Sequence, residues 1–333
     1  MAATFLTSNR NVREAVAQLA SPFRTFQSLS AGLNMNWQRL GVVLLAHVSA
    51  LPAALADGKP VRHRIMVVEY GAGEKNRLIE VSEEGRITWE HRPPSLCVHC
   101  QPLPNGHVVY AFGGSPTGVL EVDREQRVVW NYVSQCEQIL TCERLATGLT
   151  LAAEQGPCRV AAIDAQGKTA WSIDIPAQAK AAHNQMRCIH ALENGNVLVA
   201  NEADGVVREV SRDGRLVWEC PAGKDVHEAL RLKNGNTLIG CGTDKRVIEV
   251  TPEKKIVWEL KADDVPDVNL TWVTGLQLLD NGHIVVGNFL RGQEGKGAHA
   301  FEVTRDKQVV WQFADHALVK LATNVKVLEE TRE

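Results

Sequence analysis

The chain has 333 residues, of which 44% are hydrophobic and 23% are charged, and this is the composition of an ordinary globular protein. Its length allows one large domain or two of average size. The net charge is −3 and the basic residues do not cluster. Phosphate binding needs clustered Lys and Arg, so the sequence excludes nucleic acid as a main partner.

The first element in chain order is an apolar segment, residues 41–56, which follows Arg39 and ends in Ala-Leu-Ala. It is too short to span a bilayer comfortably, and it has the order of a signal peptide with cleavage before Asp57. A signal begins near the start of a chain, so we expect translation to begin at Met35. A long n-region, or a cytosolic protein with an amphipathic leader, is the alternative.

On this interpretation residues 1–34 are not part of the mature protein, and residues 35–56 are removed on export. The protein is then periplasmic or secreted, with no stable membrane span. Export would bring eight cysteines into an oxidising compartment, where an even number permits pairing without proving it.

The next elements are β-hairpins that repeat one phrase five times. An apolar residue leads into a turn, usually Asn-Gly, and an alternating strand follows: LPNGHVVYA, LATGLTLAA, LENGNVLVA, LKNGNTLIG and LLDNGHIVVG. Asn-Gly favours positive φ at both central residues, and this pattern predicts type I′ turns.

A second phrase follows in six copies, each with two β-rich runs joined by a polar turn. The copies end in Trp89, Trp130, Trp171, Trp218, Trp258 and Trp311, which lie 40 to 53 residues apart. Nine residues before five of these tryptophans stands a glutamate: Glu80, Glu121, Glu209, Glu249 and Glu302. Only the third copy differs, with Ala162.

Four strands in a unit of 40 to 50 residues are typical of a β-propeller blade. The sequence therefore predicts an all-β, six-bladed propeller over residues 57–330, with four antiparallel strands per blade. The first copy lacks an inner strand, and the chain ends in LATNVKVLEE, an inner strand with nothing after it. We expect this last strand to complete the first blade and close the ring, with Val325 and Val327 beside Ile65 and Val67.

Two resemblances rest on these repeats. The DAQGKTAW run, from Asp164 to Trp171, resembles the repeat of PQQ-type (quinoprotein alcohol dehydrogenase-like) propellers. The NGNTLI hairpins are similar to those of arylsulfotransferase-type propellers. Both resemblances cover about residues 62 to 330 through scaffold positions, and they imply a fold more than an activity.

We expect the site at one mouth of the central channel. At this mouth lie the connections between blades and the loops between the second and third strands of each blade, which are longer and more varied than the hairpin turns. Near this mouth, equivalent positions of successive repeats carry different polar residues, although the repeat is otherwise regular. The candidates for ligand binding are His99, Arg187, His227, Glu228, Trp272, Glu154, Asn201, Glu202, Asn288 and Arg291. They suit a small polar or anionic ligand such as a sugar, a sulfate ester or a peptide carboxylate.

Each candidate has a plainer interpretation. His99 and His227 can be hydrogen-bonded channel residues. Arg187 and Glu228 can pair with each other between adjacent blades. Trp272 lies outside the repeat's docking position and suits a platform for a sugar ring, but simple packing explains it as well.

We expect no metal site in this protein. Cys97-Val-His-Cys100 is a single CxxC without a second pair at zinc spacing, and Cys100 falls on the core face of its strand. Cys136 and Cys158 lie on mouth-side loops of one blade, and this makes them candidates for a disulfide.

Two function classes remain open. The first is a monomeric, exported propeller without catalysis that binds a small molecule, a glycan or a protein in its central funnel. The second is an enzyme: the arylsulfotransferase resemblance implies His227 or His99 as nucleophile with Arg187 and Arg291 clamping charge, and a lyase or hydrolase could use Glu228 or Glu202 with a histidine. LTWVTGLQLL, however, has no histidine where the catalytic blade motif of those enzymes has one.

A quinoprotein dehydrogenase is the third class, and it is disfavoured because those enzymes have eight blades and adjacent cysteines at the quinone. We expect no PQQ and no other cofactor.

The structure of the mouth can separate the first two classes. A cluster in which His, Arg and Glu side chains contact one another would favour catalysis. A broad, aromatic-rimmed mouth would favour binding.

Overall fold

A computed structural model describes residues 61–71 and 76–328, which belong to one compact unit. The predicted start at Met35 and the predicted signal peptide, residues 35–56, lie outside the described residues. The described 3-10 helices are η2 (Ala182–Asn184), η3 (Ala262–Asp264) and η4 (Pro266–Val268). Within residues 61–71 and 76–328, no helix is long and apolar enough to cross a bilayer.

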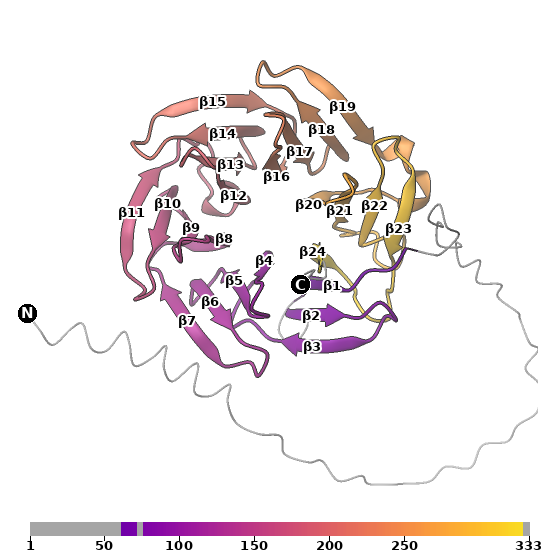
Figure 1. Cartoon of the computed structure of the whole chain (residues 1–333), viewed down its shortest axis with the longest axis horizontal. Coiled ribbons are helices and arrows are strands. Elements are labelled where there is room, and N and C mark those ends of the chain that lie inside the picture. The colour runs from indigo at the N-terminus through magenta and orange to yellow at the C-terminus, as the bar shows by residue number, and fades with distance from the viewer. Residues whose placement is uncertain (1–60, 72–75, 329–333) are drawn as a thin grey trace, which may run out of the picture. The chain divides into compact units, whose positions relative to one another are not determined.

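The strands form six antiparallel sheets of four strands each, arranged radially about a central axis (Figure 1). From the axis outward, blade 1 contains β24 (Ala322–Val327), β1 (Ile65–Glu69), β2 (Arg77–Val81) and β3 (Ile87–His91). Blade 2 contains β4 (Cys100–Pro102), β5 (Val108–Phe112), β6 (Gly118–Val122) and β7 (Val128–Val133). Blade 3 contains β8 (Gln138–Arg144), β9 (Thr150–Gln155), β10 (Arg159–Ile163) and β11 (Thr169–Asp174).

The other three blades repeat this order. Blade 4 contains β12 (Cys188–Ala191), β13 (Val197–Asn201), β14 (Val206–Val210) and β15 (Leu216–Pro221). Blade 5 contains β16 (Val226–Arg231), β17 (Thr237–Cys241), β18 (Arg246–Val250) and β19 (Ile256–Lys261). Blade 6 contains β20 (Val273–Leu278), β21 (Ile284–Asn288), β22 (Ala300–Val303) and β23 (Val309–Phe313). The predicted six-bladed propeller is confirmed.

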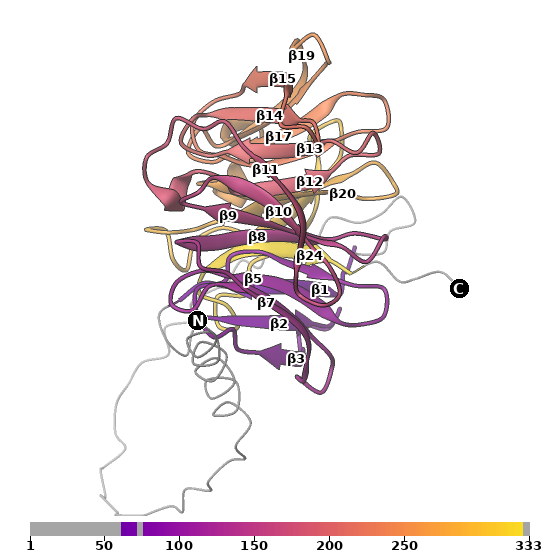
Figure 2. The same cartoon turned by 90° about the vertical axis from the view of Figure 1, so that its left-hand side faces the viewer.

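The last strand closes the ring as the sequence predicts. Strand β24 pairs antiparallel with β1, with Val327 opposite Ile65 and Val325 opposite Val67. All four side chains are buried in one apolar cluster. In the side view, β24 runs along the short axis of the ring with the other inner strands (Figure 2). The closing contact is therefore a full strand pairing with an apolar face on the core.

The hairpin turns differ from the prediction. At Leu103–Gly106 the glycine N–H donates to Leu103 O, and Leu103 N–H donates to His107 O. Gly106 has φ of +84°, whereas Asn105 is not among the residues with positive φ. The loop is therefore a type I turn followed by a left-handed glycine, and not a type I′ turn. Asn105 stabilises the turn through its side chain, because its Oδ1 accepts a hydrogen bond from His107 N–H at 3.0 Å.

The recurrent glutamates and tryptophans join each blade to the next. Glu80 of blade 1 binds Arg124 of blade 2 at 2.5 Å, and Glu302 of blade 6 binds His63 at 2.6 Å. Glu121, Glu209 and Glu249 likewise bind arginines of the following blade: Arg144, Arg231 and Arg305. Each of these arginines, with Arg124, also lies over the tryptophan of the preceding blade.

The indole N–H groups make the same connection. Trp89 Nε1 donates to Arg124 O at 3.0 Å, and Trp218 Nε1 donates to Pro252 O at 2.8 Å, in both cases to the next blade. Trp89 is only 9% exposed, whereas Trp218 is half-buried. The tryptophans therefore pack at the blade joints to different depths.

We expect Trp89→Ala to lower the free energy of unfolding by about 3–5 kcal/mol, because it removes a buried ring. Trp218→Ala should cost less, about 2 kcal/mol, since part of that ring already contacts solvent. Val217→Ala, on the same strand and exposed, serves as the control and should change stability by under about 0.5 kcal/mol. Urea denaturation measures all three; an equal loss for both tryptophans would contradict the assigned depths.

Candidate functional site

The inner strands present alternate side chains to the axis. On β12, Cys188 and His190 lie two residues apart, so they point to the same side of the strand. His99, just before β4, lines two separate cavities along the axis. We call these the mouth cavity, on the side of the connections between blades, and the far cavity, on the side of the Asn-Gly turns.

The mouth cavity has a volume of about 290 Å³. Seven of the ten predicted ligand-binding residues line it: His99, Arg187, Glu202, His227, Glu228, Trp272 and Arg291. His183, on η2, also lines it. The structure therefore brings together residues of blades 2, 4, 5 and 6 that are far apart in the sequence.

Irregularities in the inner strands turn several of these side chains toward the cavity. His227 has no partner in the ladder between β16 and β17, because Val226 pairs with Cys241 and Glu228 with Gly240. Thr274 on β20 and Thr323 on β24 are skipped in the same way. All three bulged residues line the mouth cavity. A bulge adds one residue to a strand and re-aims its side chain, and here it does so repeatedly at one end of the channel.

Arg187, Glu202 and His227 form a cluster in contact. Arg187 Nε donates to Glu202 Oε2 at 2.5 Å, and His227 Nε2 lies 3.4 Å from Glu202 Oε1. Arg187 therefore pairs with Glu202 rather than with Glu228. Burial raises the pKa of Glu202, but His227 and Arg187 lower it more, to about 2. Burial and Arg187 lower the pKa of His227 despite Glu202, so the imidazole is neutral near pH 7.

Several polar atoms around the mouth cavity are buried and have no hydrogen-bond partner within the described residues. They are His99 Nδ1, Trp272 Nε1, Thr274 Oγ1 and Asn324 Oδ1, and His227 Nε2 has only its 3.4 Å contact with Glu202. Buried polar atoms are nearly always paired in folded proteins, so each such atom requires a reason. All of them belong to residues that line this one cavity, although the atoms themselves are covered from the cavity space.

A series of aromatic rings also lines the mouth cavity. The ring of Tyr70 meets Phe289 edge-on at 5.5 Å between centroids, and Phe289 meets Trp272 at 6.1 Å. His227 continues the series, with its ring 5.8 Å from Trp272. The cavity therefore combines an apolar wall with a polar wall.

Three predicted residues do not line either cavity. Glu154 is buried and binds Tyr132, Ser134 and Arg159 at 2.5–2.6 Å. Asn201 donates to Gln185 O, and Asn288 accepts from the backbone N–H of Thr271. These side chains hold the connections between strands in place.

The far cavity is the larger of the two. It has a volume of about 530 Å³, although the sequence predicts the site at the opposite mouth. It is lined by Gln101, Glu143, His190, Gln277 and Lys326, among others. The turn after β4 contributes Leu103, Pro104 and Gly106 to this lining, so the turn flanks the far cavity.

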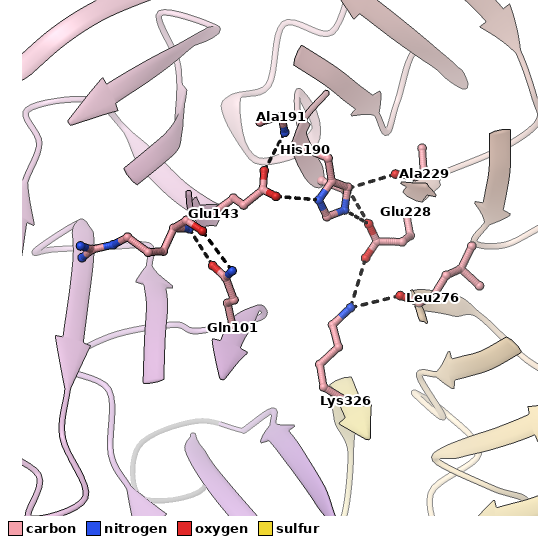
Figure 3. A network of polar contacts seen from close by, with 10 residues as sticks. Gln101, Glu143, His190, Ala191, Glu228, Ala229, Leu276 and Lys326 are labelled. Carbon is pink, nitrogen blue, oxygen red and sulfur yellow. Dashed lines mark hydrogen bonds and ion pairs between the residues drawn. The ribbon is translucent and has the colours of Figure 1, made fainter. Parts of the chain in front are cut away.

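A chain of charged groups crosses the channel between the two cavities (Figure 3). Glu143 on β8 lies 3.6 Å from His190 Nδ1, and His190 Nε2 lies 3.1 Å from Glu228 Oε1 on β16. Glu228 Oε2 is 4.0 Å from Lys326 Nζ on β24, which donates to Leu276 O at 3.1 Å. Side chains of four blades and a backbone carbonyl of a fifth therefore meet in one polar network.

The network fixes the charges of its members. Burial raises the pKa of Glu228, but His190 and Lys326 lower it more, to about 2. Burial lowers the pKa of His190, whereas Cys188, Glu143 and Glu228 raise it, and the net direction is upward. Burial, followed by Lys326, lowers the pKa of His99 to about 3. Neutral and charged histidines therefore stand side by side.

The cysteines are free thiols, including Cys136 and Cys158, so the predicted disulfide is absent from the structure. Cys136 packs in the cluster of blades 2 and 3, whereas Cys158 packs in the cluster of blades 3 and 4, so opposite faces of blade 3 separate them. Cys97 and Cys100 are fully buried against Tyr110 and Phe112. Their packing agrees with a core role.

The predicted site residues do not include Gln101, Glu143, His190 and Gln277. In four of the five hairpins these residues lie four positions before the turn asparagine, or before Thr147 in the second hairpin. The candidates His99 and Glu228 lie six residues before the asparagine of their turns. The period of two along a strand places the fourth position on the same side as the sixth, and this rule would have found them.

The chain was compared with known proteins. Residues 36–188 and 158–314 match a PQQ-type repeat family described as outer membrane protein assembly factor BamB. The comparison with curated proteins finds no match.

Solved structures share the fold. A protein of unknown function from Bacteroides caccae has a TM-score of 0.70 at 23% identity, covering 80% of this chain and 98% of that one. A catalytically inactive virginiamycin B lyase from Staphylococcus aureus, with quinupristin, has a TM-score of 0.52 at 10% identity, covering 80% and 88%. A protein from Lactobacillus plantarum has a TM-score of 0.53 at 11% identity, covering 76% and 83%. At these identities the likeness concerns the fold alone.

The Glu202 pairing predicts a pH dependence. The pKa of Glu202 falls from 4.5 to about 2 on folding. A lowered folded-state pKa stabilises the protein above the unfolded pKa, and this contribution is lost as the pH falls toward the folded one. We expect Glu202→Gln to cost about 3 kcal/mol at pH 7.

Most of that difference between variant and wild type should disappear by about pH 3. Urea denaturation across this pH range measures it. Glu83→Gln, at an exposed position, is the control and should follow the wild type at every pH. A difference that does not depend on pH would contradict the ionised pair.

Proposed function

This chain belongs to the PQQ-type β-propeller repeat family described as outer membrane protein assembly factor BamB, and on that scaffold we propose that the mouth cavity binds a small, neutral, ring-shaped polar molecule such as a sugar. The observation that carries the proposal is the lining of this cavity, where polar side chains such as His99, His227 and Asn324 stand beside Trp272 and Phe289. A ligand with several hydroxyl groups offers donors and acceptors to such polar side chains.

The shape and charge of the cavity support a neutral ring over an anion. Trp272 and Phe289 offer apolar surface for the face of a ring. The lining contains two arginines but three carboxylates, and Arg187 is already paired with Glu202. An anion such as a sulfate ester would meet no net positive charge here.

The volume of about 290 Å³ is at the lower end for ligand cavities. It favours one or two sugar rings over a protein segment, which would need a broader surface. We propose that the protein binds this ligand as a monomer.

Catalysis is the second candidate, and the contact among Arg187, Glu202 and His227 favours it. A carboxylate that holds a neutral histidine can prepare it as a general base. Analysis of the ligand after incubation separates the two: an unchanged molecule supports binding alone.

Isothermal titration and thermal shift against a panel of mono- and disaccharides test the binding proposal. A ligand that binds the native state raises the melting temperature. Trp272→Ala should weaken binding about tenfold or more, because it removes the apolar platform. Arg64→Ala, in the far cavity with an exposed side chain, is the control and should leave affinity unchanged.

Two results would contradict the proposal. One is a panel in which no sugar raises the melting temperature. The other is an affinity that responds to Arg64→Ala and not to Trp272→Ala, which would move the ligand to the far cavity.

We also propose that the protein is exported, with residues 35–56 as the signal peptide. The support is the apolar segment that ends in Ala-Leu-Ala. Mass spectrometry of the protein recovered outside the cytoplasm should give Asp57 as the first residue. An intact residue 35–56 segment on that protein would contradict this.

A further inference from the structure

Three potential metal ligands meet between the two cavities. Cys188 and His190 form a Cys-x-His pair on β12, and Glu228 extends from β16 of the next blade. Their sulfur, nitrogen and oxygen atoms all lie within 4.8 Å of one another. Cys188 Sγ is 2.5 Å from Glu228 Oε1, and His190 Nε2 is 3.1 Å from the same oxygen.

From this geometry we propose that Cys188 Sγ, His190 Nε2 and Glu228 Oε1 bind one zinc ion. Zinc takes thiolate, imidazole and carboxylate at about 2.0–2.3 Å, which places the ligand atoms about 3.3–3.6 Å apart in a tetrahedron. The distance of 3.1 Å between His190 Nε2 and Glu228 Oε1 is near these separations, whereas Cys188 Sγ and Glu228 Oε1, at 2.5 Å, must move about 1 Å apart to hold the ion. A soft sulfur with nitrogen and oxygen selects zinc or cobalt over magnesium and calcium, which prefer oxygen alone.

The charges of the cluster agree with a divalent cation. On binding, the proton of the Cys188 thiol and a proton on His190 Nε2 pass to solvent. The thiolate and the Glu228 carboxylate then carry two negative charges that balance Zn²⁺, while the imidazole stays neutral. No oxidant or reductant is involved.

Neighbouring groups hold the ligands in orientation. Glu143 Oε1 lies 3.6 Å from His190 Nδ1, and Glu143 Oε2 accepts from Ala191 N at 2.7 Å. A carboxylate on the far nitrogen of a metal-bound histidine fixes its tautomer and direction (Figure 3). Lys326 is directed to Glu228 Oε2 at 4.0 Å, which leaves Oε1 for the metal.

The site has an entry and an open side. Cys188 and Glu228 are buried, whereas the His190 side chain is 24% exposed and lines the far cavity. Three protein ligands leave a fourth position for water or a small molecule from a cavity. This inference goes beyond the sugar proposal and does not depend on it.

The test uses the full chain, freed of metal by chelator and titrated with Zn²⁺ and, separately, Co²⁺. We expect one ion per chain, and with cobalt the d–d bands of tetrahedral coordination together with a thiolate-to-metal charge-transfer band. Less than one zinc per chain at saturation, or an octahedral cobalt spectrum, would overturn the proposal.

Variants locate the ion. Cys188→Ser should abolish the charge-transfer band, and Glu228→Gln should weaken zinc binding by more than about 100-fold, whereas Glu143→Gln should weaken it about 10- to 100-fold. Cys142→Ser is the matched control, since Cys142 is a buried cysteine on the neighbouring inner strand β8. It should keep both the band and the affinity.

Circular dichroism checks that each variant folds. If Cys188→Ser fails to fold, Glu228→Gln and Glu143→Gln still decide the question. A charge-transfer band that survives in Cys188→Ser, or that disappears in Cys142→Ser, would place the metal elsewhere and overturn the proposal. Zinc affinity unchanged in both Glu228→Gln and Glu143→Gln would do the same.

Discussion

The pairing of β24 with β1 is the contact on which the structure depends. A propeller blade buries its faces only against its neighbours, so an open ring would expose two of them. Here the two ends of the domain share one sheet, and the closing strand places Val325 and Val327 in an apolar cluster that also contains residues of blade 6. The same strand carries Thr323, Asn324 and Lys326 to the axis. Closure and the candidate sites are therefore built by one segment.

The residues at the rim of the ring and those along its axis have different roles. At the rim, a glutamate of one blade binds a cation of the next, and an arginine covers a tryptophan. This contact recurs with little variation because every pair of neighbouring blades packs in the same geometry. Blade 3 has Ala162 in place of the glutamate, and there Arg212 lies 3.7 Å from the Trp171 ring centroid.

Along the axis, the blades differ from one another. The neutral His227 and His99 lie near the mouth, whereas His190 lies between Glu143 and Glu228 deeper in the channel. Charged groups in a low-dielectric channel interact strongly, so each pairing sets the protonation of its neighbours. The mouth cavity, with its aromatic wall, and the Cys188-His190-Glu228 cluster are chemically distinct parts of one channel.

The sequence by itself determined the number of blades, the closing strand and the end of the channel where seven ligand-binding candidates gather, because spacing and hairpin phrases encode local backbone structure. It misjudged the turn type, since one extra loop residue leaves the asparagine in a type I turn. Only the tertiary structure decided which side chains meet. Thr274 and His227 reach the mouth through bulges, and Glu228 meets Cys188 from another blade, 40 residues away. Such contacts depend on the radius of the ring and the register of each inner strand, and no local pattern records either.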